Sequence, residues 1–214
     1  MKQPYIEKSR DYKGVLLDLD NTLYKYSPCH DHALKKCHRF FNEHVEKMSF
    51  TDFSDFYEKG RKAVKKYNHG TSGSRSRHLY FQRALEIKYG KTRVRDSLAL
   101  GDLYWKSFIE KMKLKPWVTD FLKTIRRSGT KIAVITNQEA SLQFKKIKHL
   151  GIDDLIDYVI TSEEAGIEKP ARKIMEIALN KIKLRPSDTV FLGDDKKEDG
   201  LAARSVGVKF ILCD

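Results

Sequence analysis

The sequence has no long apolar run and no apolar segment near its N-terminus. A membrane-spanning helix needs about 18 or more consecutive apolar residues, and none of the 214 residues lies in such a stretch. Residues 1–13, MKQPYIEKSRDYK, are polar and lack the apolar centre of a secretory signal peptide. These absences argue against a membrane or secreted protein, and we expect a cytoplasmic one.

Cysteine is also scarce, with Cys29, Cys37 and Cys213 as the three representatives. An odd number without the spacing of a disulfide framework predicts reduced thiols. The run CHDHALKKCH at 29–38 contains two of them with three histidines, so a zinc site is one alternative. Its close spacing does not match paired-ligand patterns, and Ala33, Cys37 and Phe41 share one helical face. A helix with a buried cysteine is the favoured interpretation.

Negative charge is in short supply in one part of the chain. The formal net charge is +13, and residues 24–115 hold 21 Lys and Arg against 10 Asp and Glu, which leaves +11 in this segment. Such an asymmetry attracts an anionic substrate or partner, nucleic acid included. The alternative is an ordinary solvated basic surface.

Five short apolar runs predict the strands of a sheet. They are continuous rather than alternating and rich in Val and Ile, which is typical of parallel strands buried on both faces. The runs are VLL at 15–17, KIAVI at 131–135, YVI at 158–160, TVFL at 189–192 and VKFIL at 208–212.

Helical patterns separate the last four runs. They cover 141–151, 171–182 and 198–207, and a further helix is expected at about 118–128. Strands that alternate with helices predict an α/β fold, a Rossmann-like open parallel sheet.

Residues 24–115 interrupt this alternation. They carry apolar residues three and four apart, as in ALKKCHRFFNEHV at 33–45 and RHLYFQRALEIKYG at 77–90, and GTSGS at 70–74 predicts a loop. We expect an α/β core from 1–23 and 116–214, with 24–115 as an inserted helical cap.

Polar residues follow the apolar runs where a binding site is expected. The carboxyl ends of parallel strands share one edge of an open α/β sheet. Asp18 and Asp20 follow the first run, Thr136-Asn137 the second and Asp194 the fourth, while Lys169 precedes the helix after the third.

This set of side chains suits phosphoryl transfer. Clustered carboxylates repel one another unless a cation neutralises them, and oxygen ligands suit Mg²⁺. One carboxylate can attack phosphorus and another can exchange a proton with the leaving oxygen and with water. A lysine and a hydroxyl can bind phosphate oxygens.

The chain resembles the haloacid dehalogenase-like superfamily of phosphatases, in the subfamily with a helical cap inserted after the first strand. The resemblance covers essentially the whole length. It rests on DLDNT at 18–22, Thr136-Asn137, Lys169-Pro170 and GDDKKED at 193–199, in this order.

The resemblance implies a role for each motif position. Asp18 would be the nucleophile and a Mg²⁺ ligand, and Asp20 the general acid and base, with its backbone carbonyl on the metal. Asp194 would complete the protein ligands of Mg²⁺. Asp199 would not bind the metal itself but would orient Lys169 or a metal-bound water. The role of Asp195 is left open.

The same resemblance implies that Thr136 and Lys169 bind phosphate, with Asn137 adding an amide. Members that cleave carbon–halogen bonds have no leaving oxygen to protonate, so Asp20 favours a phosphatase. We expect a Mg²⁺-dependent enzyme that hydrolyses a small phosphomonoester, a nucleotide or a sugar phosphate, through an aspartyl-phosphate. The alternatives are a phosphomutase of the same superfamily and a protein that binds nucleic acid or nucleotides through the basic cap.

One segment of the cap is a candidate for substrate contact. In GTSGSRSRHLYFQR at 70–83, glycine and serine precede a helix whose start carries Arg75 and Arg77. A helix N-terminus with arginines can hold an anion. The alternative is a basic surface loop followed by an ordinary amphipathic helix.

Overall fold

The computed structural model describes residues 4–213 of the chain. It divides into two compact units, which are Met1–Lys25 with Lys113–Asp214, and Tyr26–Met112. The first is called the core here and the second the cap. The boundaries expected from the sequence, at 23/24 and 115/116, differ from these by two or three residues.

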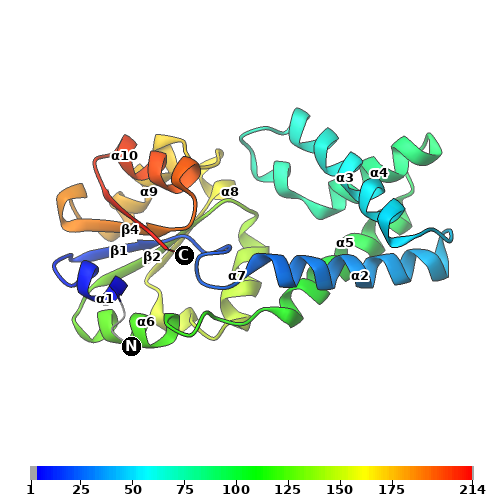
Figure 1. Cartoon of the computed structure of the whole chain (residues 1–214). Helices are drawn as coiled ribbons and strands as arrows, with labels where there is room; N and C mark the ends of the chain where they lie inside the picture. The colour runs from blue at the N-terminus through cyan, green and yellow to red at the C-terminus, as the bar shows by residue number, and fades with distance from the viewer. Residues whose placement is uncertain (1–3, 214) are drawn as a thin grey trace. The chain divides into compact units, whose positions relative to one another are not determined.

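The core contains one parallel sheet, which confirms the predicted fold class. Its strands are β1 (Gly14–Leu17), β2 (Lys131–Thr136), β3 (Tyr158–Thr161), β4 (Thr189–Gly193) and β5 (Lys209–Leu212). Their order across the sheet is β3-β2-β1-β4-β5, so the chain builds outward from β1 first on one side and then on the other. This order places β1 at the centre (Figure 1).

Both faces of the sheet are buried, which explains the continuous apolar runs. Val15 of β1 is in register with Ile132 of β2 and with Val190 of β4. Leu16 points to the other face, where it joins an apolar cluster with Phe191. No strand position in the centre is exposed to water, and alternation with polar residues would therefore be destabilising.

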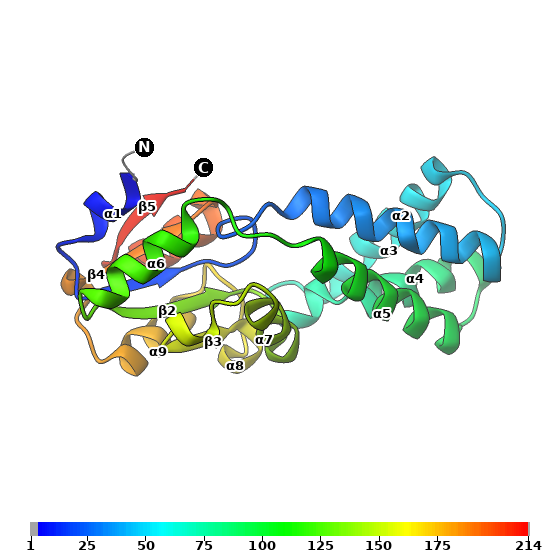
Figure 2. The same cartoon turned by 90° about the horizontal axis from the view of Figure 1, so that it is seen from below.

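Helices cover the two faces of the sheet. On one side lie α9 (Arg172–Ile182) and α10 (Leu201–Ser205), and on the other lie α1 (Pro4–Ser9) and α6 (Val118–Arg127), the face seen in Figure 2. The remaining helices of the core are α7 (Ala140–His149) and α8 (Ser162–Ala165), with the short 3₁₀ turns η2 (Asp153–Leu155) and η3 (Pro186–Asp188).

The helix expected at 198–207 has a different form. Residues Lys196–Gly200 form a π-helical turn, η4, and α10 continues from it. Asp195 begins this turn, because its side chain accepts hydrogen bonds from the backbone N–H groups of Lys197 and Glu198. A π-helical turn carries one extra residue per turn, and such turns occur often at functional sites.

The cap is helical, with aromatic side chains at its centre. Its helices are α2 (Tyr26–His44), α3 (Phe50–Tyr67), α4 (Arg77–Tyr89) and α5 (Val94–Lys111), with the 3₁₀ turn η1 at Ser72–Arg75. Ser49 and Ser76 cap the starts of α3 and α4, and Gly90 ends α4 at φ 71°. The buried rings include Phe41, Phe53, Phe81, Tyr104 and Phe108.

No helix within residues 4–213 is both long enough and apolar enough to cross a membrane.

Candidate active site

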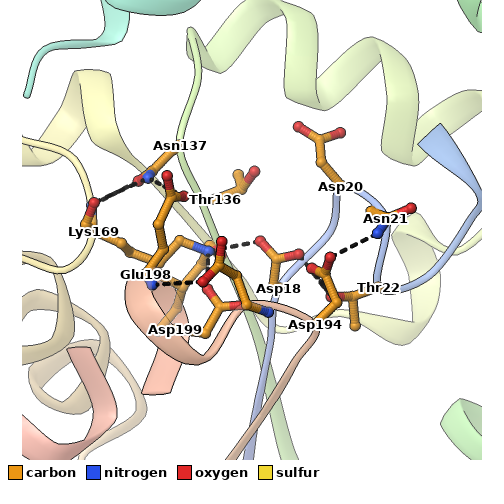
Figure 3. A network of polar contacts seen from close by, with 12 residues as sticks. Asp18, Asp20, Asn21, Thr22, Thr136, Asn137, Lys169, Asp194, Glu198 and Asp199 are labelled. Carbon is orange, nitrogen blue, oxygen red and sulfur yellow. Dashed lines mark hydrogen bonds and ion pairs between the residues drawn. The ribbon is translucent and has the colours of Figure 1, made fainter. Parts of the chain in front are cut away.

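The carboxyl ends of β1, β2 and β4 lie side by side, since β1 pairs with both of the other strands. The polar residues that follow these strands meet at this edge of the sheet, as Figure 3 shows. This is the place where ligands bind in open α/β sheets, because the connections part there and leave the strand ends accessible.

Asp18 is the most central of these residues. Its relative exposure is only 5%, and its backbone N–H continues the ladder to Leu192 O at 2.9 Å. Its Oδ2 accepts a hydrogen bond from Thr22 Oγ1 at 2.7 Å. Its Oδ1 forms an ion pair with Lys169 Nζ at 2.6 Å. Asp18 is thus fixed at the end of the central strand by contacts on both oxygens.

Lys169 reaches this position from the segment that follows β3. Its Nζ donates to Asp18 Oδ1 at 2.6 Å, to Asp199 Oδ1 at 2.7 Å and to Ile135 O at 3.0 Å. An ammonium group has three N–H donors, so all of them are used. The backbone of Lys169 is held in turn by Asn137, whose Oδ1 accepts from Lys169 N at 2.7 Å.

Burial and the ion pairs shift the pKa values of this cluster in opposite directions. It raises the pKa of Asp18 to about 7, although Lys169 favours the ionised form. Burial also raises the pKa of Asp199, against the same opposing effect of Lys169. Burial alone would lower the pKa of Lys169, but Asp18 and Asp199 outweigh it and raise this pKa. A divalent cation at the site would add positive charge that favours both carboxylates in their ionised form.

Three carboxylates could hold such a cation. One oxygen each of Asp18, Asp194 and Asp199 lies within 4.8 Å of the others. Asp194 is oriented by Asn21 Nδ2, which donates to its Oδ2 at 2.7 Å, and Thr22 Oγ1 lies 3.1 Å from its Oδ1. The donors are all oxygens, which is the chemistry that Mg²⁺ prefers, so the residues present fit this ion.

Gly193 gives Asp199 the room that it occupies. A Cβ atom at this position would lie 2.2 Å from Asp199 Oδ2. The same oxygen accepts a hydrogen bond from Asp195 N at 3.2 Å. The glycine before Asp194 therefore has a packing reason, since any side chain there would push Asp199 away from Lys169.

Asn137 joins the second strand end to the fourth. Its Nδ2 lies 3.1 Å from Glu198 Oε2 and 3.3 Å from Lys169 O. Thr136, one residue earlier, is wholly buried, and its Oγ1 contacts Gln143 Nε2. In this structure Asn137 therefore positions the backbone of Lys169 and the side chain of Glu198.

The side chain of Asp20 is held by helix α7. Lys146 Nζ lies 2.6 Å from its Oδ1, and Gln143 Nε2 lies 3.2 Å from its Oδ2. Tyr24 OH also donates to Oδ1. Burial by itself would raise the pKa of Asp20, but Lys146, Tyr24 and Gln143 reverse this effect and lower it.

Sequence reasoning assigned no role to Gln143 or Lys146. Both lie on the same face of α7 as Leu142 and Ile147, and all of these side chains are buried. Helical spacing of three and four residues could have predicted their burial. It places both polar residues on the apolar face of a helix that begins beside the predicted site.

Arg77 lies inside the cap, and its relative exposure is only 7%. Its guanidinium carbon is 5.2 Å, 5.1 Å and 4.6 Å from the ring centres of Tyr80, Tyr104 and Trp105. One Nη donates to Arg75 O at 2.6 Å and the other to Tyr26 OH. Its Nε has no hydrogen-bond partner among residues 4–213.

Comparison with known proteins identifies the family. A model of the haloacid dehalogenase-like hydrolases matches residues 12–207. A ribulose-1,5-bisphosphate 5-phosphatase of Halopiger xanaduensis is 40% identical over 201 residues, covering 94% of this chain and 84% of the relative. A glyceraldehyde 3-phosphate phosphatase of Methanopyrus kandleri is 29% identical over 198 residues, covering 92% and 81%.

The fold is also shared with a solved structure, the HAD-hydrolase YfnB of Bacillus subtilis bound to magnesium. The TM-score is 0.73 at 18% identity, and the match covers 94% of this chain and 88% of that one. The family model spans most of the chain, and the two relatives described above, which cover 94% and 92% of it, are phosphatases. The chain therefore belongs to the haloacid dehalogenase-like hydrolases, and it is a phosphatase.

Proposed function

We propose that the protein is a Mg²⁺-dependent phosphomonoesterase that removes a phosphate group from a small phosphorylated sugar through an aspartyl-phosphate on Asp18. The observation that carries the proposal is the arrangement around this residue. Asp18 lies at the end of the central strand, with Lys169 on one carboxylate oxygen and Thr22 on the other. The oxygens of Asp194 and Asp199 complete an acidic group beside it.

The first step transfers the phosphoryl group to the protein. A carboxylate oxygen of Asp18 forms a bond to phosphorus, and the bond between phosphorus and the ester oxygen breaks. The electron pair of that bond stays on the leaving oxygen, which takes a proton from Asp20 and departs as an alcohol.

The second step returns Asp18 to its initial state. A water molecule gives one proton to Asp20, and its oxygen bonds to phosphorus. The bond between phosphorus and Asp18 breaks, inorganic phosphate leaves, and Asp20 again carries the proton that it lost.

Lys169 and Thr136 would favour these two steps by binding phosphate oxygens. The Thr136 hydroxyl would donate to one oxygen, and the Lys169 ammonium group would bind another in exchange for one of the three acceptors that it contacts in this structure, Asp18, Asp199 and Ile135 O. When bound by Asp18, Asp194 and the backbone carbonyl of Asp20, Mg²⁺ would reduce the repulsion between the substrate phosphate and the attacking carboxylate.

The names of two relatives support sugar phosphates as the class of substrate. The two phosphatases aligned above act, by their names, on ribulose 1,5-bisphosphate and on glyceraldehyde 3-phosphate. Both compounds are small phosphorylated sugars. We therefore place sugar phosphates ahead of nucleotides as substrates of this chain, with a bisphosphorylated sugar first because that relative has the higher identity, 40% against 29%.

Phosphate release by the purified protein tests the proposal. The panel contains ribulose 1,5-bisphosphate, glyceraldehyde 3-phosphate, other sugar phosphates and nucleoside monophosphates, each with Mg²⁺ and with a chelator. We expect Mg²⁺-dependent release that Asp18→Asn abolishes and that Asp195→Asn retains, because the Asp195 side chain caps η4 instead of joining the acidic group.

The outcomes separate the proposed function from its rivals. A phosphomutase would convert a sugar phosphate without net release of inorganic phosphate. A binding protein with a basic cap would release none and would lose affinity for nucleic acid steeply as salt rises. Release that persists in Asp18→Asn would contradict the assigned nucleophile.

Contact of the substrate with the cap stays a prediction for Arg75 and Arg77. Because Arg77 is buried among aromatic rings, its replacement also removes packing inside the cap. Arg75 is half-buried, so Arg75→Ala is the cleaner test. We expect a larger rise in KM for the sugar phosphate than for p-nitrophenyl phosphate, and equal rises would speak against a contact.

A further inference from the structure

The carboxylate of Asp20 is surrounded by hydrogen-bond donors from its own loop and from α7. Tyr24 OH and Lys146 Nζ both donate to Oδ1, the latter at 2.6 Å, and Gln143 Nε2 donates to Oδ2 at 3.2 Å. Lys146 and Gln143 belong to a different part of the sequence, more than 120 residues away. We call these two residues the α7 clamp.

Lys146 is a buried lysine on a helix whose neighbouring lysines are exposed. The relative exposure of its side chain is 1%, whereas that of the Asp20 side chain is 27%. The neighbouring Lys145 and Lys148 are exposed. Burial of an ammonium group is costly unless a carboxylate and further acceptors offset it. The position of Lys146 is therefore explained by its ion pair with Asp20.

Gln143 connects Asp20 to the second strand. It lies one helical turn before Lys146, and its Nε2 also contacts Thr136 Oγ1. In that contact the amide is the donor and the hydroxyl oxygen accepts. The hydroxyl proton of Thr136 is then directed to another acceptor, and under the proposed function this is a phosphate oxygen.

We propose that Lys146 and Gln143 are positioning residues of the phosphatase reaction, which hold the ionised Asp20 carboxylate of this structure at the place where, once it has taken up a proton, it meets the leaving oxygen. The inference rests on the proposed function, in which Asp20 is the group that meets that oxygen. Neither clamp residue needs to touch the substrate. Their contribution passes through Asp20, and for Gln143 through Thr136 as well.

The leaving group distinguishes this role from a merely structural one. A phenolate such as p-nitrophenolate departs from phosphorus without a proton, whereas the alkoxide of glycerol 2-phosphate needs one. For these two esters kcat/KM reports the steps up to departure of the leaving group. Loss of a well-placed general acid should therefore affect the alkyl ester and spare the aryl ester.

The experiment compares kcat/KM for the two esters in wild type, Lys146→Met, Lys145→Met, Asp20→Asn and the double variant Lys146→Met/Asp20→Asn. Because general acid catalysis contributes about 10²–10⁴-fold, we expect Lys146→Met to lose at least about tenfold on glycerol 2-phosphate. On p-nitrophenyl phosphate the loss should stay within about threefold, and Lys145→Met should resemble wild type on both esters.

The double variant supplies the second criterion. If Lys146 acts through Asp20, its replacement has no further effect on the alkyl ester once Asp20 is asparagine. Equal losses on both esters, or losses that multiply in the double variant, would overturn the inference. If Lys146→Met does not fold, Lys146→Gln, which keeps the length and a neutral donor, takes its place in the same comparison.

The two proposals fail in different ways. A wild-type protein that with Mg²⁺ releases phosphate neither from these two esters nor from the sugar phosphates of the panel contradicts the proposed function and the inference with it. An active wild type in which Lys146→Met shows no ester-dependent loss contradicts the inference alone.

Discussion

Lys169 Nζ lies 2.6 Å from Asp18 Oδ1, and the relative exposure of the two side chains is 2% and 8%. The lysine follows β3 and the aspartate follows β1, so the pair joins segments that are 151 residues apart. Asp199 lies on the other side of the same ammonium group at 2.7 Å. One buried ammonium group thus separates two buried carboxylates.

Replacement of Lys169 by methionine should destabilise the protein and abolish its activity. Asp18 and Asp199 would face each other without a counter-ion, and the loss of one partner from a buried pair costs about 3–5 kcal/mol. Thermal unfolding should show a lower midpoint, and phosphate release should fall at least about 100-fold. The control is Lys173→Met, because Lys173 is exposed on α9. A fully active Lys169→Met would contradict the assigned role.

Mg²⁺ should stabilise the folded protein through the acidic group. A ligand that binds the folded state alone at 100 times its Kd raises the free energy of unfolding by about 2.7 kcal/mol. Unfolding curves with and without Mg²⁺ should show this rise in wild type and in Asp195→Asn, and most of it should be lost in Asp194→Asn. A shift of equal size in all three proteins would mean that the ion binds elsewhere.

The contact between α3 and α4 depends on a glycine. A Cβ atom at Gly60 would lie 2.1 Å from the backbone oxygen of Tyr80, and the backbone would have to move to relieve it. Gly60→Ala should therefore lower the free energy of unfolding by about 1–3 kcal/mol or more. The control is Gly73→Ala, where the nearest atom would be 3.6 Å away. Equal unfolding curves for the two variants would contradict this account.

The stability of the cap should fall in mild acid because of His30. Burial, together with the nearby Arg77, lowers the pKa of His30, whose Nδ1 contacts Tyr104 OH at 2.7 Å. The unfolded chain then binds the proton more readily, since the ordinary pKa of histidine is about 6.5. The stabilising effect of this neutral histidine is present above the pKa of the unfolded state. It is lost as the pH falls from there to the lower pKa of the folded state.

Unfolding midpoints measured between about pH 5 and 8 test this prediction. His30→Gln should flatten the slope on the acidic side, and a variant of the exposed His69, His69→Gln, should leave it unchanged. An unaltered slope in His30→Gln would show that other groups cause the acid sensitivity.

The sequence was most informative where burial leaves few choices. Each of the five apolar runs became a strand of the parallel sheet, because a strand covered on both faces admits almost no polar residue. The helical nature of 24–115 followed from apolar spacing, although the separate helices α3 and α5 were not resolved from it. The helix at 198–207 was only partly right, since spacing does not distinguish a π-helical turn from an α-helix.

Local order also placed the main site residues. Asp18 and Asp194 follow β1 and β4 directly and Thr136 is the last residue of β2, so the parallel direction of the sheet is enough to bring them to one edge. The position of Lys169 does not follow from strand direction alone, because it depends on the segment after β3 and on the hydrogen bonds of its backbone to Asn137. Its identity as a site residue was predicted from the motif order rather than from spacing.

The sequence by itself determined the sheet, the inserted cap and the edge at which the polar residues gather, because these follow from periodicity and from residues that are neighbours in the chain. Only the tertiary structure decided which polar residues of a helix are buried and what they contact. Lys146 lies against Asp20 and Arg77 among three aromatic rings. Whether a long charged side chain stays in water depends on the partner across the interface, and that partner comes from a distant segment.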